Sequence, residues 1–310
     1  MTRSTADAVD PLAPWRPRFA DAVRELDAPV VVACSGGPDS VALLALATDA
    51  DLAPVAVHVD HGLRAGSDDE ADHVRLIARA LGADFRAARV TVALGSNLEA
   101  RARDARYAAL DEARVDVGAD AVLVGHTADD QAETVLLNVL RGAAASGLAG
   151  MAARHGTVVR PLLDFRRSEA RALCAALGLT VLDDPMNDDR AFRRVAIRHD
   201  VLPYLSALAE RDLVPVLARQ AEILRSDSEY LDELAVRAWP GDDGPRAAAL
   251  VALPMPLARR ALRRWLGAPP PSSAEIERVL AVAAGDARAA ELAGGRAVRR
   301  SAGVLVLTVG

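Results

Sequence analysis

An alternation of strand-like and helical segments is the feature that most limits how this chain can fold. The run APVVVAC at residues 28–34 is continuously apolar and rich in valine, which is typical of a parallel strand buried on both faces. Further strand-like runs follow at 53–59, 84–92, 120–126 and 157–163. Helical segments separate these runs as far as about residue 180. The alternation predicts an α/β domain with an open, doubly wound parallel sheet and helices on both faces.

The pattern changes after about residue 200, and this change predicts a second domain. Long helical segments are expected at 212–238, 247–266 and 274–284, and a short hairpin at the valine-rich end. We therefore expect an N-terminal segment and helix over residues 1–27 and the α/β domain over 28–205. Residues 206–310 are expected to form a smaller, mainly helical domain that ends in the short hairpin.

The chain contains no lysine, which excludes several kinds of chemistry. All 37 basic residues among its 310 are arginine, so a Walker A loop, a kinase-type lysine and a Schiff-base lysine are excluded. The abundance of alanine shows that a GC-rich coding sequence also explains the missing lysines. The absence therefore limits the mechanism and does not by itself indicate a function.

The remaining totals predict a cytoplasmic protein without a membrane partner. Cys34 and Cys174 form no CxxC pair, which argues against a zinc or iron–sulfur site built from cysteines. No apolar run reaches transmembrane length, and the N-terminus lacks the apolar core of a signal peptide. The net charge of −6 argues mildly against a nucleic-acid partner, but net charge is a poor guide where basic residues cluster. A homodimer remains open.

The turn SGGPDS, directly between the first strand and the first helix, is a candidate phosphate site. Its glycines let the backbone approach a ligand closely, and the helix N-terminus offers N–H groups to an anion. Asp39 suits a Mg²⁺ ion that bridges phosphates rather than a phosphate itself. An ordinary tight turn is also rich in glycine, but the complete string after the first strand is more specific. The candidate residues are Ser35, Gly36, Gly37, Pro38, Asp39 and Ser40.

This turn resembles the signature of the N-type ATP pyrophosphatases, the PP-loop enzymes. Members of this superfamily split ATP between the α- and β-phosphates and adenylate a carbonyl oxygen, which a nitrogen or sulfur nucleophile then displaces. The resemblance implies a parallel sheet with helices on both faces and ATP bound by residues 35–40. Such enzymes need no Walker lysine, in agreement with a chain that has none.

Six further blocks, in order along the chain, resemble one branch of that superfamily, the tRNA(Ile)-lysidine synthetases. The blocks are HVDHGLR (58–64), NLEARARDARYAAL (97–110), GHTADDQAETVLLNVLRG (125–142), GLAGM (147–151), RPLL (160–163) and DDPMNDDRAFRRVAIRHDVLPYL (183–205). The C-terminal third is similar to the helical substrate domain of the shorter members. Two departures are Val195, where many members have asparagine, and RGAAASG in place of RGSG.

The resemblance implies an ATP-dependent ligation of free lysine to the wobble cytidine of an isoleucine tRNA, through an adenylated cytidine. ATP, with Mg²⁺, would give AMP and pyrophosphate. Asp130 and Glu133 lie three residues apart after the fourth strand. Ordinary stabilisation of a helix N-terminus is one explanation for such acids. The resemblance implies that they bind the lysine ammonium and the Mg²⁺–ATP, and that one of them takes the ammonium's proton.

Arginines supply the positive charge that the resemblance requires. Arg106 shares a helix face with Arg103 and is expected over the phosphates. Arg198, with Arg194, is a candidate for contact with pyrophosphate or the tRNA backbone. A basic stripe at helical spacing is a candidate tRNA contact and consists of Arg259, Arg260, Arg263 and Arg264. A solvated face is the alternative explanation for each of these groups.

Histidines at two strand ends have less specific roles. His58 and Asp60 end the second strand, and the resemblance implies that this strand end flanks the adenine through backbone atoms. With His61 they would make a metal site of only three ligands, which argues against one. His126 ends the fourth strand and either orients a phosphate or is a core residue.

Two other functions remain as alternatives. A tRNA thiolase of the same fold usually needs paired or catalytic cysteines, which this spacing does not offer. A non-catalytic nucleotide- or RNA-binding protein would keep the phosphate turn for regulation. Lysine-dependent release of AMP separates these alternatives from the ligase.

Overall fold

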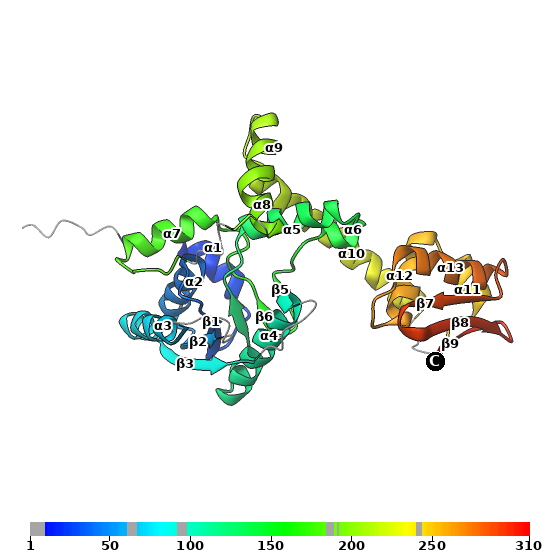
Figure 1. The fold of residues 1–310 in the computed structure, drawn as a ribbon, viewed down its shortest axis with the longest axis horizontal. Helices are drawn as coiled ribbons and strands as arrows, with labels where there is room; N and C mark the ends of the chain where they lie inside the picture. The colour runs from blue at the N-terminus through cyan, green and yellow to red at the C-terminus, as the bar shows by residue number, and fades with distance from the viewer. Residues whose placement is uncertain (1–9, 61–66, 92–97, 184–188, 191, 240–243) are drawn as a thin grey trace, which may run out of the picture. The chain divides into compact units, whose positions relative to one another are not determined.

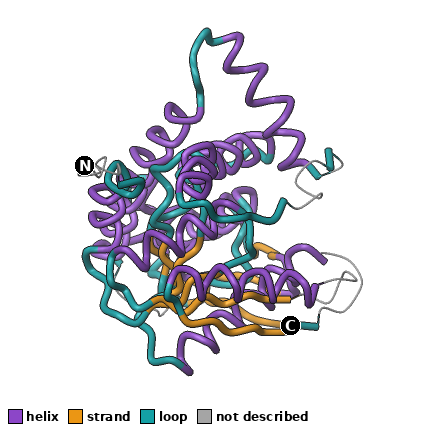
Figure 2. Tube along the Cα trace, turned by 90° about the vertical axis from the view of Figure 1, so that its left-hand side faces the viewer, coloured by secondary structure: helices purple, strands orange, loops and turns teal. Residues whose placement is uncertain are grey.

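The computed structural model describes residues 10–60, 67–91, 98–183, 189–190, 192–239 and 244–310. Helices predominate over strands along the chain (Figure 2). The chain forms two compact units, Met1–Glu222 and Ile223–Gly310, which are described separately.

Unit 1 is built on a six-stranded sheet in the order β3-β2-β1-β4-β6-β5 (Figure 1). All neighbouring strands are parallel except β5, which pairs antiparallel with β6. The strands are β1 (Val30–Ala33), β2 (Pro54–Asp60), β3 (Asp84–Arg89), β4 (Val122–Val124), β5 (Arg154–His155) and β6 (Val158–Val159). The predicted open, mainly parallel sheet is confirmed. The fifth predicted strand, near 157–163, is present as the two-residue β6, and β5 adds a short antiparallel strand at the edge.

Helices cover both faces of this sheet, as predicted. One face packs against α1, α2, α3 and α7, and the other face packs against α4. The helices of this unit are α1 (Arg16–Val23), α2 (Pro38–Asp49), α3 (Ser67–Leu81), α4 (Leu98–Asp116), α5 (Ala128–Leu140), α6 (Ala145–Leu148), α7 (Arg167–Ala176), α8 (Arg193–Ala196) and α9 (Leu202–Leu208), with a π-helical turn η2 (Ile197–Val201) and the first part of α10 (Val214–Ala238).

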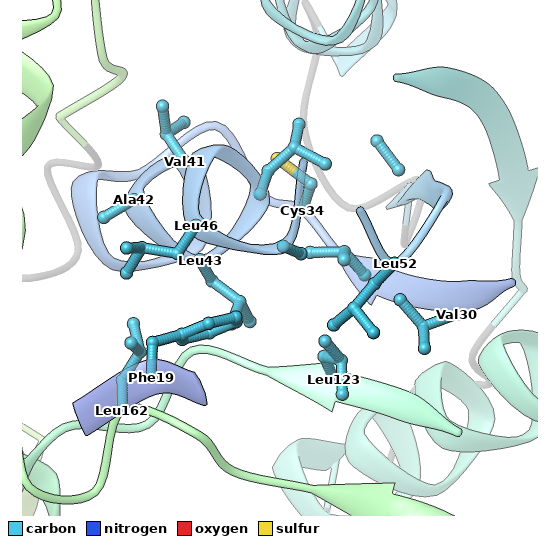
Figure 3. Close-up of a cluster of buried hydrophobic side chains, with 14 of the residues drawn as sticks. Phe19, Val30, Cys34, Val41, Ala42, Leu43, Leu46, Leu52, Leu123 and Leu162 are labelled. Atoms are coloured by element: carbon cyan, nitrogen blue, oxygen red, sulfur yellow. The ribbon is translucent and has the colours of Figure 1, made fainter. Parts of the chain in front are cut away.

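The larger core of unit 1 holds α2 in place, and α2 carries the phosphate turn at its N-terminus. Every residue of α2 from Ser40 to Ala47 is buried. Figure 3 shows Phe19 of α1 and Leu162 against Leu43, and Val30 and Leu52 at the strand side of the same cluster. Burying a helix on so many sides fixes its position against the sheet, since the apolar area removed from water is large.

The strand order reverses between β1 and β4. The chain passes outward from β1 to β2 and β3 through α2 and α3 on one face, and it returns to β4 through α4 on the other. In open α/β sheets a crevice forms at this reversal, beyond the carboxyl ends of the two strands. The phosphate turn follows β1 and α5 follows β4, so both lie at this position.

Unit 2 packs three helices against a small antiparallel sheet in the order β7-β8-β9. Its elements are the rest of α10, α11 (Ala247–Ala252), α12 (Met255–Leu266), α13 (Ser273–Ala284), β7 (Ala289–Leu292), a 3-10 turn η3 (Ala293–Gly295), β8 (Arg296–Ser301) and β9 (Val304–Val309). The predicted hairpin is β8–β9, and β7 adds a third strand. The single helix predicted over 247–266 is wrong: Pro254 separates α11 from α12, because proline cannot donate the helical hydrogen bond.

The division into units falls within α10, whereas the sequence placed the change between residues 205 and 206. The first turns of α10 therefore belong with the α/β unit, where Val214 and Leu217 pack against Ala128 and Leu202. None of the described helices is long and apolar enough to span a membrane.

Candidate functional site

The phosphate turn is shaped by its own serines. Ser40 Oγ accepts a hydrogen bond from the Ser35 N–H at 3.2 Å and donates one to the Gly37 carbonyl at 2.9 Å. Gly36 has a φ of +86°, and a Cβ there would lie 2.7 Å from Leu182 Cδ1. The turn therefore needs glycine at this position, and its Ser40 hydroxyl maintains the backbone shape ahead of α2.

Gly125 lets the end of β4 approach this turn. A Cβ at Gly125 would lie 2.9 Å from the Asp39 carbonyl oxygen and 3.2 Å from the Ser40 nitrogen. Because a side chain cannot fit there, glycine is required for the first turn of α2 to lie directly against β4. The residues after β1 and those after β4 are brought together by this contact.

Asp39 presents an unsatisfied carboxylate oxygen in the first turn of α2. Its Oδ1 is buried without a hydrogen-bond partner among the described residues, and its Oδ2 lies 3.6 Å from Arg167 Nε. Burial and the neighbouring carboxylate of Asp130 raise the pKa of Asp39 to about 7, against the opposing effect of Arg167 and Arg198. A buried carboxylate oxygen without a donor fits a cation ligand, because a cation would supply the missing charge and contact.

Asp130 caps the start of α5 with one oxygen and meets an arginine with the other. Its Oδ2 accepts from the Thr127 N–H and from Thr127 Oγ1, each at 2.9 Å. Its Oδ1 lies 2.9 Å from Arg167 Nη2. Burial alone would raise the pKa of Asp130, but Arg167 and the Thr127 N–H lower it below the ordinary value, so the group is ionised at neutral pH.

Glu133 is the most enclosed charge in this cluster, with 1% of its side chain exposed. Its Oε1 accepts from Arg198 Nε at 2.7 Å and from Arg167 Nη1 and Nη2 at 3.2 Å. Its Oε2 lies 3.3 Å from Arg198 Nη2 and 3.5 Å from Arg194 Nε. Arg198 belongs to η2, a kind of helical irregularity that is common at functional sites. Glu133 therefore orders three guanidinium groups.

Arg167 is the residue that the sequence analysis missed. It begins α7 and reaches Asp39, Asp130 and Glu133 together. Its own N–H donates to Asp129 Oδ2 at 2.8 Å, and Asp129 also pairs with Arg166. The available signal was the Arg166–Arg167 pair, two residues beyond the RPLL block, since so many buried acids need buried cations.

A second group of arginines lies on α4. The Arg103 and Arg106 guanidiniums lie 5.0 and 5.8 Å from the centre of the Tyr107 ring. Burial lowers the pKa of Arg106, and the neighbouring Arg103 lowers it further. No carboxylate pairs with Arg106 in the part of the chain that the structure describes. A half-buried, unbalanced positive charge of this kind suits a phosphate oxygen.

His126 follows β4 and is neutral. Its Nδ1 accepts a hydrogen bond from Arg160 Nε at 3.3 Å, so its proton is on Nε2. Burial, together with the charge of Arg160, lowers the pKa of His126 to about 4 in spite of the nearby Asp130. His126 can therefore donate one hydrogen bond to a ligand without contributing charge.

The side chains of His58 and Asp60, at the end of β2, contact neighbouring parts of the α/β unit. His58 is buried, and its Nδ1 donates to the Cys34 carbonyl at 3.1 Å, directly before the phosphate turn. Asp60 Oδ2 lies 3.3 Å from Arg89 Nε. His61 lies outside the described residues, and among those described no three His, Cys, Asp or Glu side chains are grouped as a metal site. Contact of this strand end with adenine stays a prediction.

The basic stripe of α12 lies in unit 2 and is largely paired within it. Arg259 Nε lies 2.7 Å from Glu277, and Arg260 Nη1 lies 2.7 Å from Asp232. Arg264 donates to the Trp239 carbonyl at 3.1 Å, and Arg263 is half-buried. These pairs reduce the charge that the stripe offers, and its role in tRNA binding stays a prediction.

Comparison with known proteins first defines the class. Residues 17–205 match the PP-loop domain family, and residues 246–306 match the TilS substrate binding domain. The solved structure of the U34-tRNA thiolase NcsA from Methanococcus maripaludis, with its [4Fe-4S] cluster, has the same fold. Its TM-score is 0.59 at 18% identity, over 70% of this chain and 80% of that one. Fold and phosphate turn together define a PP-loop protein.

Curated relatives then define the family. The tRNA(Ile)-lysidine synthase of Streptomyces coelicolor is 44% identical over 91% of this chain and 85% of its own length. Those of Nocardia farcinica and Mycolicibacterium paratuberculosis are 44% and 48% identical, over 81% and 76% of this chain and 80% and 73% of their own. The chain belongs to the tRNA(Ile)-lysidine synthase family, which confirms the resemblance found in the motif blocks.

Proposed function

We propose that this protein ligates free lysine to the wobble cytidine of tRNA(Ile), through an adenylated cytidine, with release of AMP and pyrophosphate. The observation that carries the proposal is the cluster at the carboxyl ends of β1 and β4. It joins the phosphate turn to Asp39, Asp130 and Glu133 and to the arginines that surround them. Family membership supports the same reaction.

In the first step the cytosine O2 attacks the α-phosphorus of ATP. The new bond joins O2 to phosphorus, and the bond from that phosphorus to the pyrophosphate oxygen breaks. The N–H groups at the start of α2 bind the phosphates, and Arg106 and Arg198 stabilise the charge that develops on their oxygens. Asp39, with its unpartnered oxygen, is the residue that would hold a Mg²⁺ ion. That ion, when bound, supplies further positive charge to the phosphates.

In the second step the ε-amine of lysine attacks carbon 2 of the adenylated cytidine, and AMP leaves. A carboxylate must first bind the ammonium and take its proton, since a protonated amine is not a nucleophile. Both oxygens of Glu133 face arginines, whereas among the described residues the one arginine within 3.5 Å of Asp130 Oδ1 is Arg167. The contacts favour Asp130 for this role and Glu133 as the residue that positions the arginines.

The cysteines argue against a thiolase. Cys34 and Cys174 are both buried, and burial raises the pKa of each, to about 11 for Cys174. A nucleophilic cysteine needs a lowered pKa, because the thiolate is the reactive form. The substrates and partners proposed are therefore Mg²⁺–ATP, free lysine and tRNA(Ile), which fit a cytoplasmic location.

Release of AMP by the full chain with total tRNA and ATP tests the proposal. We expect release to depend on both tRNA and lysine. Turnover with cysteine or another sulfur donor, but not with lysine, would support the thiolase instead. ATP binding without any AMP release would indicate a non-catalytic nucleotide-binding protein.

A further inference from the structure

One guanidinium lies among the three carboxylates of the site. Arg167 Nη2 is 2.9 Å from Asp130 Oδ1, its Nη1 and Nη2 are 3.2 Å from Glu133 Oε1, and its Nε is 3.6 Å from Asp39 Oδ2. Asp39 comes from α2 and the other two acids from α5, so this side chain joins the two helices that follow β1 and β4. A substrate cation that binds Asp39 or Asp130 would have to displace this guanidinium from that acid.

The three contacts differ in how much each acid depends on Arg167. Glu133 has Arg198 and Arg194 as further partners, and Asp130 has the Thr127 N–H. Asp39 has the longest contact to Arg167, and its other oxygen is buried without a hydrogen-bond partner among the described residues. The neutralisation of Asp39 is therefore the least complete, and this is where a better cation gains most.

The attachment of Arg167 allows its side chain to turn while its backbone stays in place. The Arg167 N–H is bonded to Asp129 Oδ2 at 2.8 Å, in the first turn of α7. The Arg167 side chain is 24% exposed, so it is not completely enclosed by its neighbours. Both of its terminal nitrogens already contact Glu133, which can retain them when the other two contacts break.

We propose that Arg167 is an internal substitute for the substrate's cation. In the free protein it occupies the place between Asp39 and Asp130. It leaves Asp39 when a divalent cation arrives with ATP, and it leaves Asp130 to the lysine ammonium, while it keeps Glu133. This inference rests on the proposed function, because it takes metal-bound ATP as a substrate. The exchange keeps the buried acids compensated in both states, and it makes cation binding by the empty protein weak.

Binding of Mn²⁺ to the full chain without nucleotide, followed by the electron paramagnetic resonance of free Mn²⁺, tests the exchange. We expect Arg167→Gln to bind Mn²⁺ roughly tenfold more tightly than the unaltered protein, since a competing charge is removed. Arg166→Gln is the matched control: it removes the same charge from the neighbouring residue, which pairs with Asp129 and Asp212. Its Mn²⁺ affinity should stay within about twofold of the original, because it contacts neither Asp39 nor Asp130.

Two more variants test whether the charge of residue 167 and the carboxylate of Asp39 account for the change in Mn²⁺ affinity. Arg167→Lys keeps the charge and should bind Mn²⁺ as weakly as the unaltered protein. Adding Asp39→Asn to Arg167→Gln should abolish the gain. Equal or weaker binding by Arg167→Gln than by Arg166→Gln would overturn the proposal, and so would a gain that survives Asp39→Asn. If Arg167→Gln has a low melting temperature, Arg167→Met replaces it. This variant also removes the charge and keeps a long side chain, and we expect the same gain in Mn²⁺ affinity.

The outcome is independent of catalysis. Mn²⁺ binding is measured without ATP, tRNA or lysine, so an unaltered protein that released no lysine-dependent AMP would remove the proposed function and leave this result standing. Conversely, normal AMP release by the unaltered protein, together with an unchanged Mn²⁺ affinity in Arg167→Gln, would contradict the proposed exchange and leave the proposed function standing.

Discussion

Two groups of arginines in unit 1 differ in how their charge is used. The first group pairs with the buried carboxylate of Glu133 and consists of Arg167, Arg194 and Arg198. On α4, Arg103 and Arg106 lie against Tyr107, and Arg106 meets no carboxylate among the described residues. The first group is largely neutralised by Glu133 and orders the site, whereas in the second group the charge of Arg106 is offset by no described carboxylate. Composition cannot show this difference, because every cation is the same residue.

Replacing the acid of the phosphate turn should give the largest effect. Asp39→Asn removes the oxygen that fits a cation, and we expect AMP formation to fall by roughly a thousandfold or more. Initial rates of AMP release at saturating tRNA and lysine measure it. Asp49→Asn, at the other end of α2 and paired with Arg16, is the control and should keep the rate. An Asp39→Asn variant that adenylates tRNA normally would show that the phosphate turn is assigned wrongly.

Removing the acid of the neutralised group should cost stability. Glu133→Gln leaves three guanidiniums around a neutral amide, and we expect the free energy of unfolding of unit 1 to fall by about 3 kcal/mol. Urea unfolding followed by circular dichroism measures this. Asp72→Asn breaks an exposed pair with Arg75 and should cost less than about 0.5 kcal/mol. Equal losses in the two variants would contradict the difference drawn between the two groups.

Removing a cation of the unbalanced group should cost rate and leave stability unchanged. Because burial and Arg103 both disfavour the charge of Arg106, Arg106→Gln should not lower the melting temperature. The same variant should slow AMP formation by about a hundredfold, as for the loss of one donor to developing charge. Arg114→Gln is the control, since Arg114 lies on the same helix and pairs with Asp111. It should lower the melting temperature and leave the rate of AMP formation unchanged. If Arg106→Gln unfolds early with its rate intact, Arg106 is structural.

In unit 2 the carboxylate of Glu275 is bound by N–H groups and a hydroxyl instead of guanidiniums. We expect its replacement to have the smallest effect of the four. The Ser272 hydroxyl and N–H and the Ala293 N–H lower the pKa of Glu275 from 4.5 to about 2. A lowered pKa stabilises the folded form above pH 4.5, and this contribution disappears as the pH falls from 4.5 to 2. Glu275→Gln should therefore be less stable at pH 7, with the difference closing across that interval. Fluorescence of Trp239 and Trp265, which pack together in unit 2, measures it. A difference that stays constant from pH 7 to pH 2 would contradict the assignment.

The parts that the sequence predicts are those with local signals. Valine-rich runs predict β1 and β2 because a strand covered on both faces has no polar side to show. The phosphate turn and the acids of α5 are recognisable because short spacing fixes each of them at the start of its own helix, α2 or α5. The two-residue strands β5 and β6 are too short to carry a pattern.

Long-range charge pairing is what the sequence does not predict. Arg167 lies 34 residues from Glu133 along the chain, and no periodicity connects them. The sequence therefore assigns Glu133 to lysine, whereas its contacts in the structure favour a role in positioning arginines. Likewise the stripe Arg259–Arg264 looks uniformly basic until Glu277 and Asp232 are placed beside it.

The most direct test of the ligase assignment is mass spectrometry of nucleosides from tRNA(Ile) incubated with the protein, ATP and isotope-labelled lysine. We predict a labelled lysine on the wobble cytidine, one AMP released for each lysine attached, and no product from the Asp39→Asn variant. An unmodified cytidine, or a sulfur-containing base in its place, would contradict the account.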